Sequence, residues 1–115
     1  MIQEYLKHFG AGWQNAFTPK LEILIRMFPT VNIVSAIRHF GTLRITADGV
    51  LDNDQRFVVD CILYKIERES ATICEGCGKP CRIAKTEHLS EKKMLCWKCY
   101  ALEVDAIMSD NTQTQ

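Results

Sequence analysis

Five of the six cysteines lie in one stretch, CEGCGKPCRIAKTEHLSEKKMLCWKC, which spans residues 74–99. Cys74 and Cys77 form one C-x-x-C pair, and Cys96 and Cys99 form a second, with 18 residues between the pairs. Two intervening residues let a single tight turn present both sulfurs to one ion, and Zn²⁺ takes four thiolates at the corners of a tetrahedron. The spacing is typical of a zinc site. The sequence therefore predicts Zn²⁺ bound by these four cysteines.

Other chemistries use the same residue type. Disulfides form in oxidising compartments, but the N-terminus MIQEYLKHFGAGW lacks the basic head, apolar run and cleavage site of a signal peptide. A thioredoxin-like redox pair needs a βαβ setting, which neither pair is predicted to have. An iron–sulfur cluster is held by four cysteines as well. Zinc is the preferred interpretation, and these three alternatives stay open.

Four protein ligands fill the coordination shell of zinc and leave no position for a water or a substrate. We therefore expect a structural ion rather than a catalytic one. Cys81 is interpreted as a spare thiol; the alternative is that it replaces Cys74 or Cys77 as a ligand, for which its spacing is the poorer fit. His88 is interpreted as a solvated turn residue, and Cys61 as a small core residue of a helix.

No catalytic residue is predicted elsewhere in the chain. His39 has no serine or cysteine nucleophile with an evident relation to it. Asp48, Asp52, Asp54 and Asp60 suggest a metal-dependent nuclease, but helix capping and a solvated face explain the last three more simply. We expect the protein not to be an enzyme.

The N-terminal half predicts two helices and a β-hairpin. One short helix is expected within residues 1–10, followed by a turn at GAGW. A second helix is expected to begin with Thr18 as N-cap and Pro19 as first residue, and to end before Pro29. Residues 31–49 alternate in polarity and are rich in β-branched side chains, which predicts a hairpin that reverses at Gly41-Thr42.

A long helix is predicted to follow, capped by Asp52 with Gln55 completing a capping box. Its expected apolar stripe is Phe57, Val58, Cys61, Ile62 and Ile66. After Cys99 another helix is expected, with Leu102 and either Ile107 or Ala106 facing inward.

The predicted fold class is therefore α+β: N-terminal helices, a hairpin, a long helix and a C-terminal four-cysteine zinc ribbon. Residues 1–73 would form the body, and residues 74–108 the zinc ribbon with a C-terminal helix packed on that body. Residues 109–115 would be a disordered tail.

The composition bears on the class of partner. The 14 basic and 14 acidic residues give a formal charge of zero, whereas a general nucleic-acid binder shows a basic excess. The chain has no apolar run of the roughly 18–20 residues that a membrane span needs. We therefore expect a cytosolic protein that binds another protein. A nucleic-acid-binding zinc-ribbon regulator is the alternative.

The candidate partner-binding residues are Trp13, Arg38, Arg44, Lys92 and Lys93. Tryptophan and arginine are enriched in binding hot spots. The simpler alternative is that Trp13 covers the core, that Trp97 packs on the zinc knuckle and that the charged side chains are solvated.

Three stretches, GAGW, IRHFGTLRI and ATICEGCGKP…MLCWKC, occur in an order that resembles a family of short proteins from phages, prophages and bacterial mobile elements. The resemblance covers roughly residues 10–100. The matching positions are Gly12-Trp13, Phe40-Gly41, Leu43-Arg44, Cys74, Cys77, Gly78 and Leu95-Cys96. Cys99 stands where the family has a histidine ligand, and Cys81 where it usually has glycine.

The resemblance implies zinc, a compact α+β domain and a mobile-element setting in the cytoplasm of a bacterial host. It implies no mechanism. In that setting, an inhibitor of a host defence complex, such as an anti-CRISPR protein, is the natural hypothesis.

Overall fold

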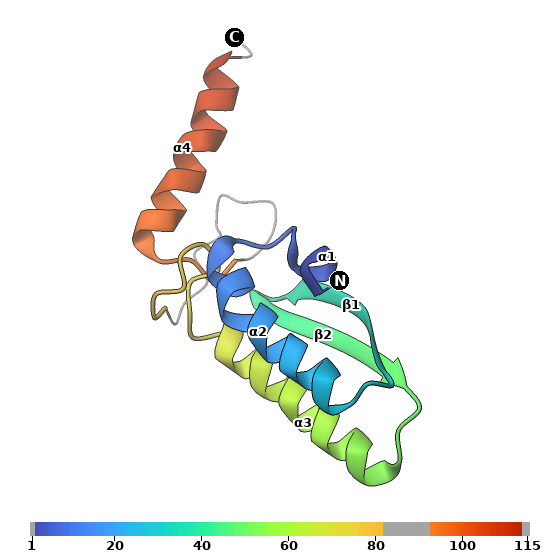
Figure 1. The fold of residues 1–115 in the computed structure, drawn as a ribbon. Helices are drawn as coiled ribbons and strands as arrows, with labels where there is room; N and C mark the ends of the chain where they lie inside the picture. The colour runs from blue at the N-terminus through green and yellow to red at the C-terminus, as the bar shows by residue number, and fades with distance from the viewer. Residues whose placement is uncertain (1, 82–92, 114–115) are drawn as a thin grey trace.

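The computed structural model describes residues 2–81 and 93–113. Its elements are α1 (Ile2–Leu6), α2 (Ala11–Met27), β1 (Val31–His39), β2 (Thr42–Gly49), α3 (Asn53–Ser70) and α4 (Trp97–Gln113). Helices α2 and α3 lie side by side and pack with the β1-β2 hairpin, while α4 extends away from this body (Figure 1). The predicted α+β class, with a cysteine cluster in the C-terminal part, is confirmed.

The hairpin is antiparallel and pairs Val31 with Gly49 at its open end and His39 with Thr42 at its closed end. The connecting residues are therefore Phe40 and Gly41, one position earlier than predicted. Both have positive φ, 51° and 86°, as the type I′ turn requires to match the twist of the strands. Phe40 occupies a position that asparagine or glycine usually takes. Its ring is exposed at the tip of the hairpin.

Helix α3 has the predicted capping box, in which the Asp52 side chain accepts from the Gln55 backbone and the Gln55 side chain accepts from the Asp52 backbone. The predicted apolar stripe is largely wrong. The helix buries Val59, Leu63, Ile66 and Ser70, whereas Phe57, Val58 and Cys61 are exposed. Only Ile66 and the partly buried Ile62 of the predicted stripe pack on the core.

The sequence does not determine which face of α3 is buried, because apolar residues run almost continuously from Phe57 to Tyr64. In the structure, the buried face is the one that carries Ser70, whose side chain forms a tertiary hydrogen bond with the hairpin. The Ser70 hydroxyl accepts from the Leu43 backbone N–H at 2.7 Å and donates to the Glu67 carbonyl at 2.6 Å.

Helix α2 begins at Ala11, so the predicted start at Thr18 and Pro19 is wrong, and so is the predicted turn at GAGW. Pro19 lies inside the helix, and the helix ends at Met27 with Phe28 as its C-cap, before Pro29 as expected. Its buried face combines Leu21 and Leu24 with residues of the first turns, Gly12, Trp13 and Phe17.

Helix α4 also differs from expectation. It continues to Gln113, past the predicted limit of order at residue 108. Leu102, Ala106 and Ile107 are exposed, so the prediction that they face inward is wrong. Within the described ranges, no helix has both the length and the apolar character needed to cross a membrane.

Candidate metal centre

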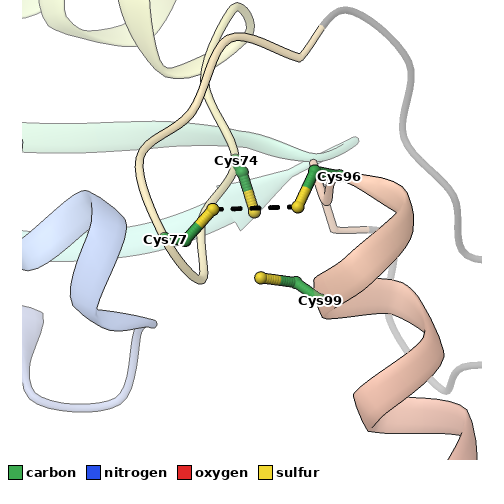
Figure 2. Close-up of side chains that lie close together, drawn as sticks. All are labelled: Cys74, Cys77, Cys96 and Cys99. Atoms are coloured by element: carbon green, nitrogen blue, oxygen red, sulfur yellow. Dashed lines mark hydrogen bonds between the residues drawn. The ribbon is translucent and has the colours of Figure 1, made fainter.

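The four predicted ligands, Cys74, Cys77, Cys96 and Cys99, converge. Their sulfur atoms all lie within 4.8 Å of one another, and Figure 2 shows them pointing toward a common centre from the loop after α3 and from the start of α4. The Cys77 and Cys96 sulfurs are 3.7 Å apart, and none of the four is in a disulfide. Tetrahedral zinc with bonds of about 2.3 Å separates its sulfurs by about 3.8 Å. The arrangement therefore fits a tetrathiolate metal site.

The first pair sits in a tight loop that its own backbone closes. The Gly78 N–H donates to the Cys74 carbonyl at 2.9 Å, and the Cys74 N–H donates to the Lys79 carbonyl at 2.7 Å. Gly78 has φ of 83°, a conformation that glycine adopts at no steric cost. The Glu75 N–H donates to the Met94 carbonyl at 2.6 Å. This last bond ties the loop to the segment that carries the second pair.

The second pair lies at the N-terminus of α4, where Cys96 immediately precedes the first helical residue. A hydrogen bond from the backbone N–H of Cys99 lowers the pKa of the Cys96 thiol to about 6. Burial, together with the neighbouring thiols, raises the pKa of Cys99. Because the thiolate is the form that binds metal, the helix N-terminus supplies one sulfur already in that form at neutral pH.

The loop that carries Cys74 and Cys77 also caps α2. The backbone N–H of Gly12 donates to the Gly76 carbonyl, and that of Trp13 donates to the Glu75 carbonyl, both at 3.1 Å. The first N–H groups of any helix lack intrahelical partners. In α2 the cysteine loop provides acceptors for two of these groups, which explains why the helix begins at Ala11 without a capping side chain.

Gly12 permits this contact because it lacks a side chain. A Cβ at this position would lie 2.3 Å from the Gly78 nitrogen and 2.4 Å from the Cys74 carbonyl oxygen. Both are backbone atoms of the cysteine loop, so the loop itself would have to shift. Gly12 is therefore a position where the backbone of α2 lies directly against the backbone of the candidate metal centre.

We predict that Gly12→Ala destabilises the protein by about 2 kcal/mol through overpacking. The direction of the change in stability is informative, because replacing glycine with alanine within a helix ordinarily stabilises a protein by about 1 kcal/mol. Chemical denaturation of the metal-loaded protein measures the effect, and Asn15→Ala, at an exposed position of the same helix, serves as the control. A Gly12→Ala variant as stable as the parent would contradict the close approach.

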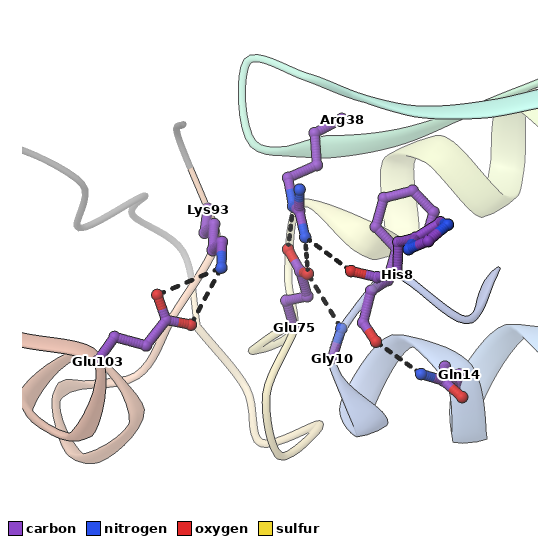
Figure 3. A network of polar contacts seen from close by, with 8 residues as sticks. His8, Gly10, Gln14, Arg38, Glu75, Lys93 and Glu103 are labelled. Carbon is purple, nitrogen blue, oxygen red and sulfur yellow. Dashed lines mark hydrogen bonds and ion pairs between the residues drawn. The ribbon is translucent and has the colours of Figure 1, made fainter. Parts of the chain in front are cut away.

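Glu75, between the first two cysteines, is 2 % exposed and forms a buried ion pair with Arg38. Arg38 donates from Nε to Oε1 at 2.8 Å and from Nη2 to Oε2 at 2.6 Å, and the Gly10 N–H also donates to Oε2 at 3.1 Å. Figure 3 shows this carboxylate between the hairpin and the start of α2. The pair therefore joins the cysteine loop to both. Sequence reasoning missed Glu75, whose position inside the C-x-x-C pair was the available signal.

The predicted partner-binding residues do not share one surface. Trp13 is fully buried in the core, so its prediction as a surface anchor is wrong. Arg38 forms an ion pair with Glu75, and its side chain is only 14 % exposed. Arg44 pairs with Glu67 at 2.8 Å, and Lys93 with Glu103 at 3.3 Å. Lys92 lies outside the described residues.

The other residues singled out from the sequence fall at separate places. Trp97 is 69 % exposed rather than packed on the cysteine loop. Cys61 is exposed, so its assignment to the core is wrong. Cys81 lies outside the cluster and contacts the Leu95 carbonyl at 3.0 Å. His39 packs edge-on against Phe40, and His88 lies outside the described residues.

Fold and site together define a small α+β protein whose C-terminal part is built around a four-cysteine cluster. Comparison of the chain with protein-family models, with curated proteins and with solved structures found no match.

Proposed function

We propose that the protein is a zinc-stabilised binding protein of a phage or mobile element, that it has no enzymatic role, and that it acts on a host protein. The observation that carries the proposal is the closed cluster of four sulfurs within 4.8 Å. Its donors are all thiolates, which suit Zn²⁺ and iron–sulfur centres and do not suit Mg²⁺ or Ca²⁺. Four protein ligands leave no open position, which supports a structural ion.

The role of the ion follows from what it would join. Cys74 and Cys77 belong to the loop that caps α2, and Cys96 and Cys99 begin α4. A bound zinc would fix the direction in which α4 leaves the body. It would also hold the loop carbonyls against the N-terminus of α2.

Charge supports a protein partner over a nucleic acid. Within the described residues, Lys20, Arg44 and Lys93 are each paired with a glutamate, and the whole chain has a formal charge of zero. Nucleic-acid affinity arises largely from basic side chains that neutralise phosphates. Neither observation favours such a surface.

Exposed apolar side chains of the hairpin suit a protein partner. Phe40 at the tip is 75 % exposed, and Val34 and Ile37 on β1 are 52 % and 50 % exposed. Ile37 lies opposite Arg44 of β2 in the register. We propose that this hairpin surface (Val34, Ile37, Phe40 and Arg44) contacts the partner, with Phe40 as its anchor. Arg44 is the one residue that this surface retains from the sequence-based candidates.

The resemblance to phage and mobile-element proteins supports a host target. Occlusion of a host defence complex, as an anti-CRISPR protein would achieve, is the form we propose for this binding. It requires no chemistry from the protein itself.

The experiment uses the zinc-loaded protein to capture a partner from host lysate, after which the affinity of the purified partner is measured. Phe40→Asn removes the aromatic ring and keeps a residue that the type I′ turn prefers. We expect the variant to fold normally and to bind at least about tenfold more weakly, as loss of a hot-spot aromatic does. Val50→Ala is the control, because Val50 is exposed just beyond the open end of the hairpin.

Nucleic-acid binding is tested with labelled single- and double-stranded oligonucleotides at about 50 and 200 mM salt, where a binder that makes many phosphate contacts loses about 10³-fold or more in affinity. We expect no measurable binding. Salt-sensitive binding to oligonucleotides, with no protein captured, would replace this proposal with the nucleic-acid-binding regulator.

A further inference from the structure

Helix α4 carries an apolar stripe on one side. Trp97, Tyr100, Val104 and Ile107 follow one another at spacings of three, four and three residues, which are the a and d positions of a heptad repeat. Met108 lies beside Ile107 at the edge of the stripe. Trp97, Ile107 and Met108 are exposed, and Tyr100 and Val104 are partly exposed. The polar residues Lys98, Asp105 and Ser109 lie on the other side of the helix.

The stability of α4 calls for a packing partner. The helix has 17 residues and extends away from the body (Figure 1). An isolated helix of about this length is marginal in water, and helices in proteins gain most of their stability by packing an apolar face. Among the described residues, the Lys93–Glu103 ion pair and the cysteine cluster hold the first two turns.

We infer that the α4 stripe pairs with the same stripe of a second copy of this chain, antiparallel, to form a homodimer. An antiparallel pair stacks a positions on d positions. Trp97 then faces Ile107 of the second copy, and Tyr100 faces Val104 of the second copy. Each of the four layers combines one aromatic ring with one β-branched side chain, so the stripe is complementary in size to itself, as a twofold interface requires.

Charge favours the antiparallel direction. Lys98 lies in the first turn of α4 and Asp105 comes later in a helix whose last turn has no basic residue. Lys93 precedes the helix and is already paired with Glu103 of the same chain. The helix dipole adds positive charge at the first end and negative charge at the second. Antiparallel pairing places opposite ends together, whereas parallel pairing would place like ends together. It also places the two bodies at opposite ends of the helix pair.

The area of the stripe sets the expected affinity. Five apolar side chains from each copy bury on the order of 800–1,000 Å² in total, below the 1,200 Å² or more of stable interfaces. We therefore expect a dimer that dissociates on dilution, with a dissociation constant on the order of micromolar.

The test is sedimentation equilibrium of the zinc-loaded full chain over a wide concentration range, combined with a matched pair of variants. Ile107→Asp places a charge in the stripe of both copies and is expected to weaken dimerisation at least about tenfold. Leu102→Asp makes the same kind of change at an exposed residue on the opposite side of α4 and is expected to leave dimerisation unchanged. Circular dichroism and zinc content verify that both variants fold.

Trp97 provides a second readout, because Trp13 is already buried. Its fluorescence is expected to shift to the blue as the dimer forms, and this shift is expected to disappear in Ile107→Asp. Small-angle scattering of the dimer is expected to show two separated lobes. A parent chain that stays monomeric at millimolar concentration, equal effects of the two aspartates, or a single-lobed dimer would overturn the inference.

Discussion

Replacing Cys99 with serine is expected to abolish tight metal binding and to unfold the C-terminal part of the chain. Cys99 is the ligand that α4 contributes from within its own first turn. Structural zinc supplies about 10–16 kcal/mol of apparent binding free energy, which is also folding free energy. Loss of one of four thiolates is expected to lower zinc affinity by at least about a hundredfold, more than the loss of an outer-shell partner costs.

Cobalt substitution, far-ultraviolet circular dichroism and thermal unfolding measure this effect. The variant is expected to lose the thiolate-to-cobalt absorption and part of its helical signal. Cys61→Ser and Cys81→Ser are the matched controls, because both cysteines lie outside the cluster. If Cys81→Ser reduced metal binding as strongly as Cys99→Ser, Cys81 would have to be a ligand and the four-cysteine set would be wrong.

Glu75→Ala is expected to destabilise the protein by about 3–5 kcal/mol, the usual cost of removing one member of a buried ion pair. The change leaves Arg38, which is 14 % exposed, without its carboxylate. It also removes the acceptor of the Gly10 N–H. Equilibrium denaturation of the metal-loaded protein measures the loss.

Glu67→Ala provides the control, because Glu67 makes the more exposed ion pair with Arg44. We expect that change to cost about 1 kcal/mol or less. A double-mutant cycle with Arg38→Met is expected to show strong coupling between Arg38 and Glu75. Equal costs for Glu75→Ala and Glu67→Ala would show that the buried pair does not join the three segments.

The metal ligands could be predicted from the sequence because their geometry is local. Two residues between cysteines suffice to bring two sulfurs together, and the fold then has only to place the two pairs next to each other. The hairpin and the capping box of α3 were predicted for the same reason, since each depends on residues a few positions apart.

The start of α2 could not be predicted, because its caps come from a distant part of the chain. Thr18 and Pro19 form a local start signal, yet the carbonyls of Glu75 and Gly76 cap the helix at Gly12 and Trp13. The same contact buries Trp13, which the sequence alone left open between core and surface. Tertiary contacts overrode a valid local signal.

The orientation of α4 was predicted wrongly. An apolar periodicity indicates which face of a helix is buried, but it does not indicate which part of the protein, or which other molecule, covers that face. Leu102 and Ile107 were assigned to the protein's own core, while the structure leaves both exposed. In the proposed dimer, the stripe that contains Ile107 is covered by a second copy. Leu102, on the other side of the helix, stays at the surface.

The most direct test of the central claim is the metal content of the purified protein, measured by inductively coupled plasma mass spectrometry together with its visible absorption spectrum. We predict about one zinc per chain, no visible absorption, and loss of the zinc in Cys99→Ser. A protein without bound metal, or one that contains iron and sulfide with the visible absorption of an iron–sulfur cluster, would contradict the zinc site on which the proposed function rests.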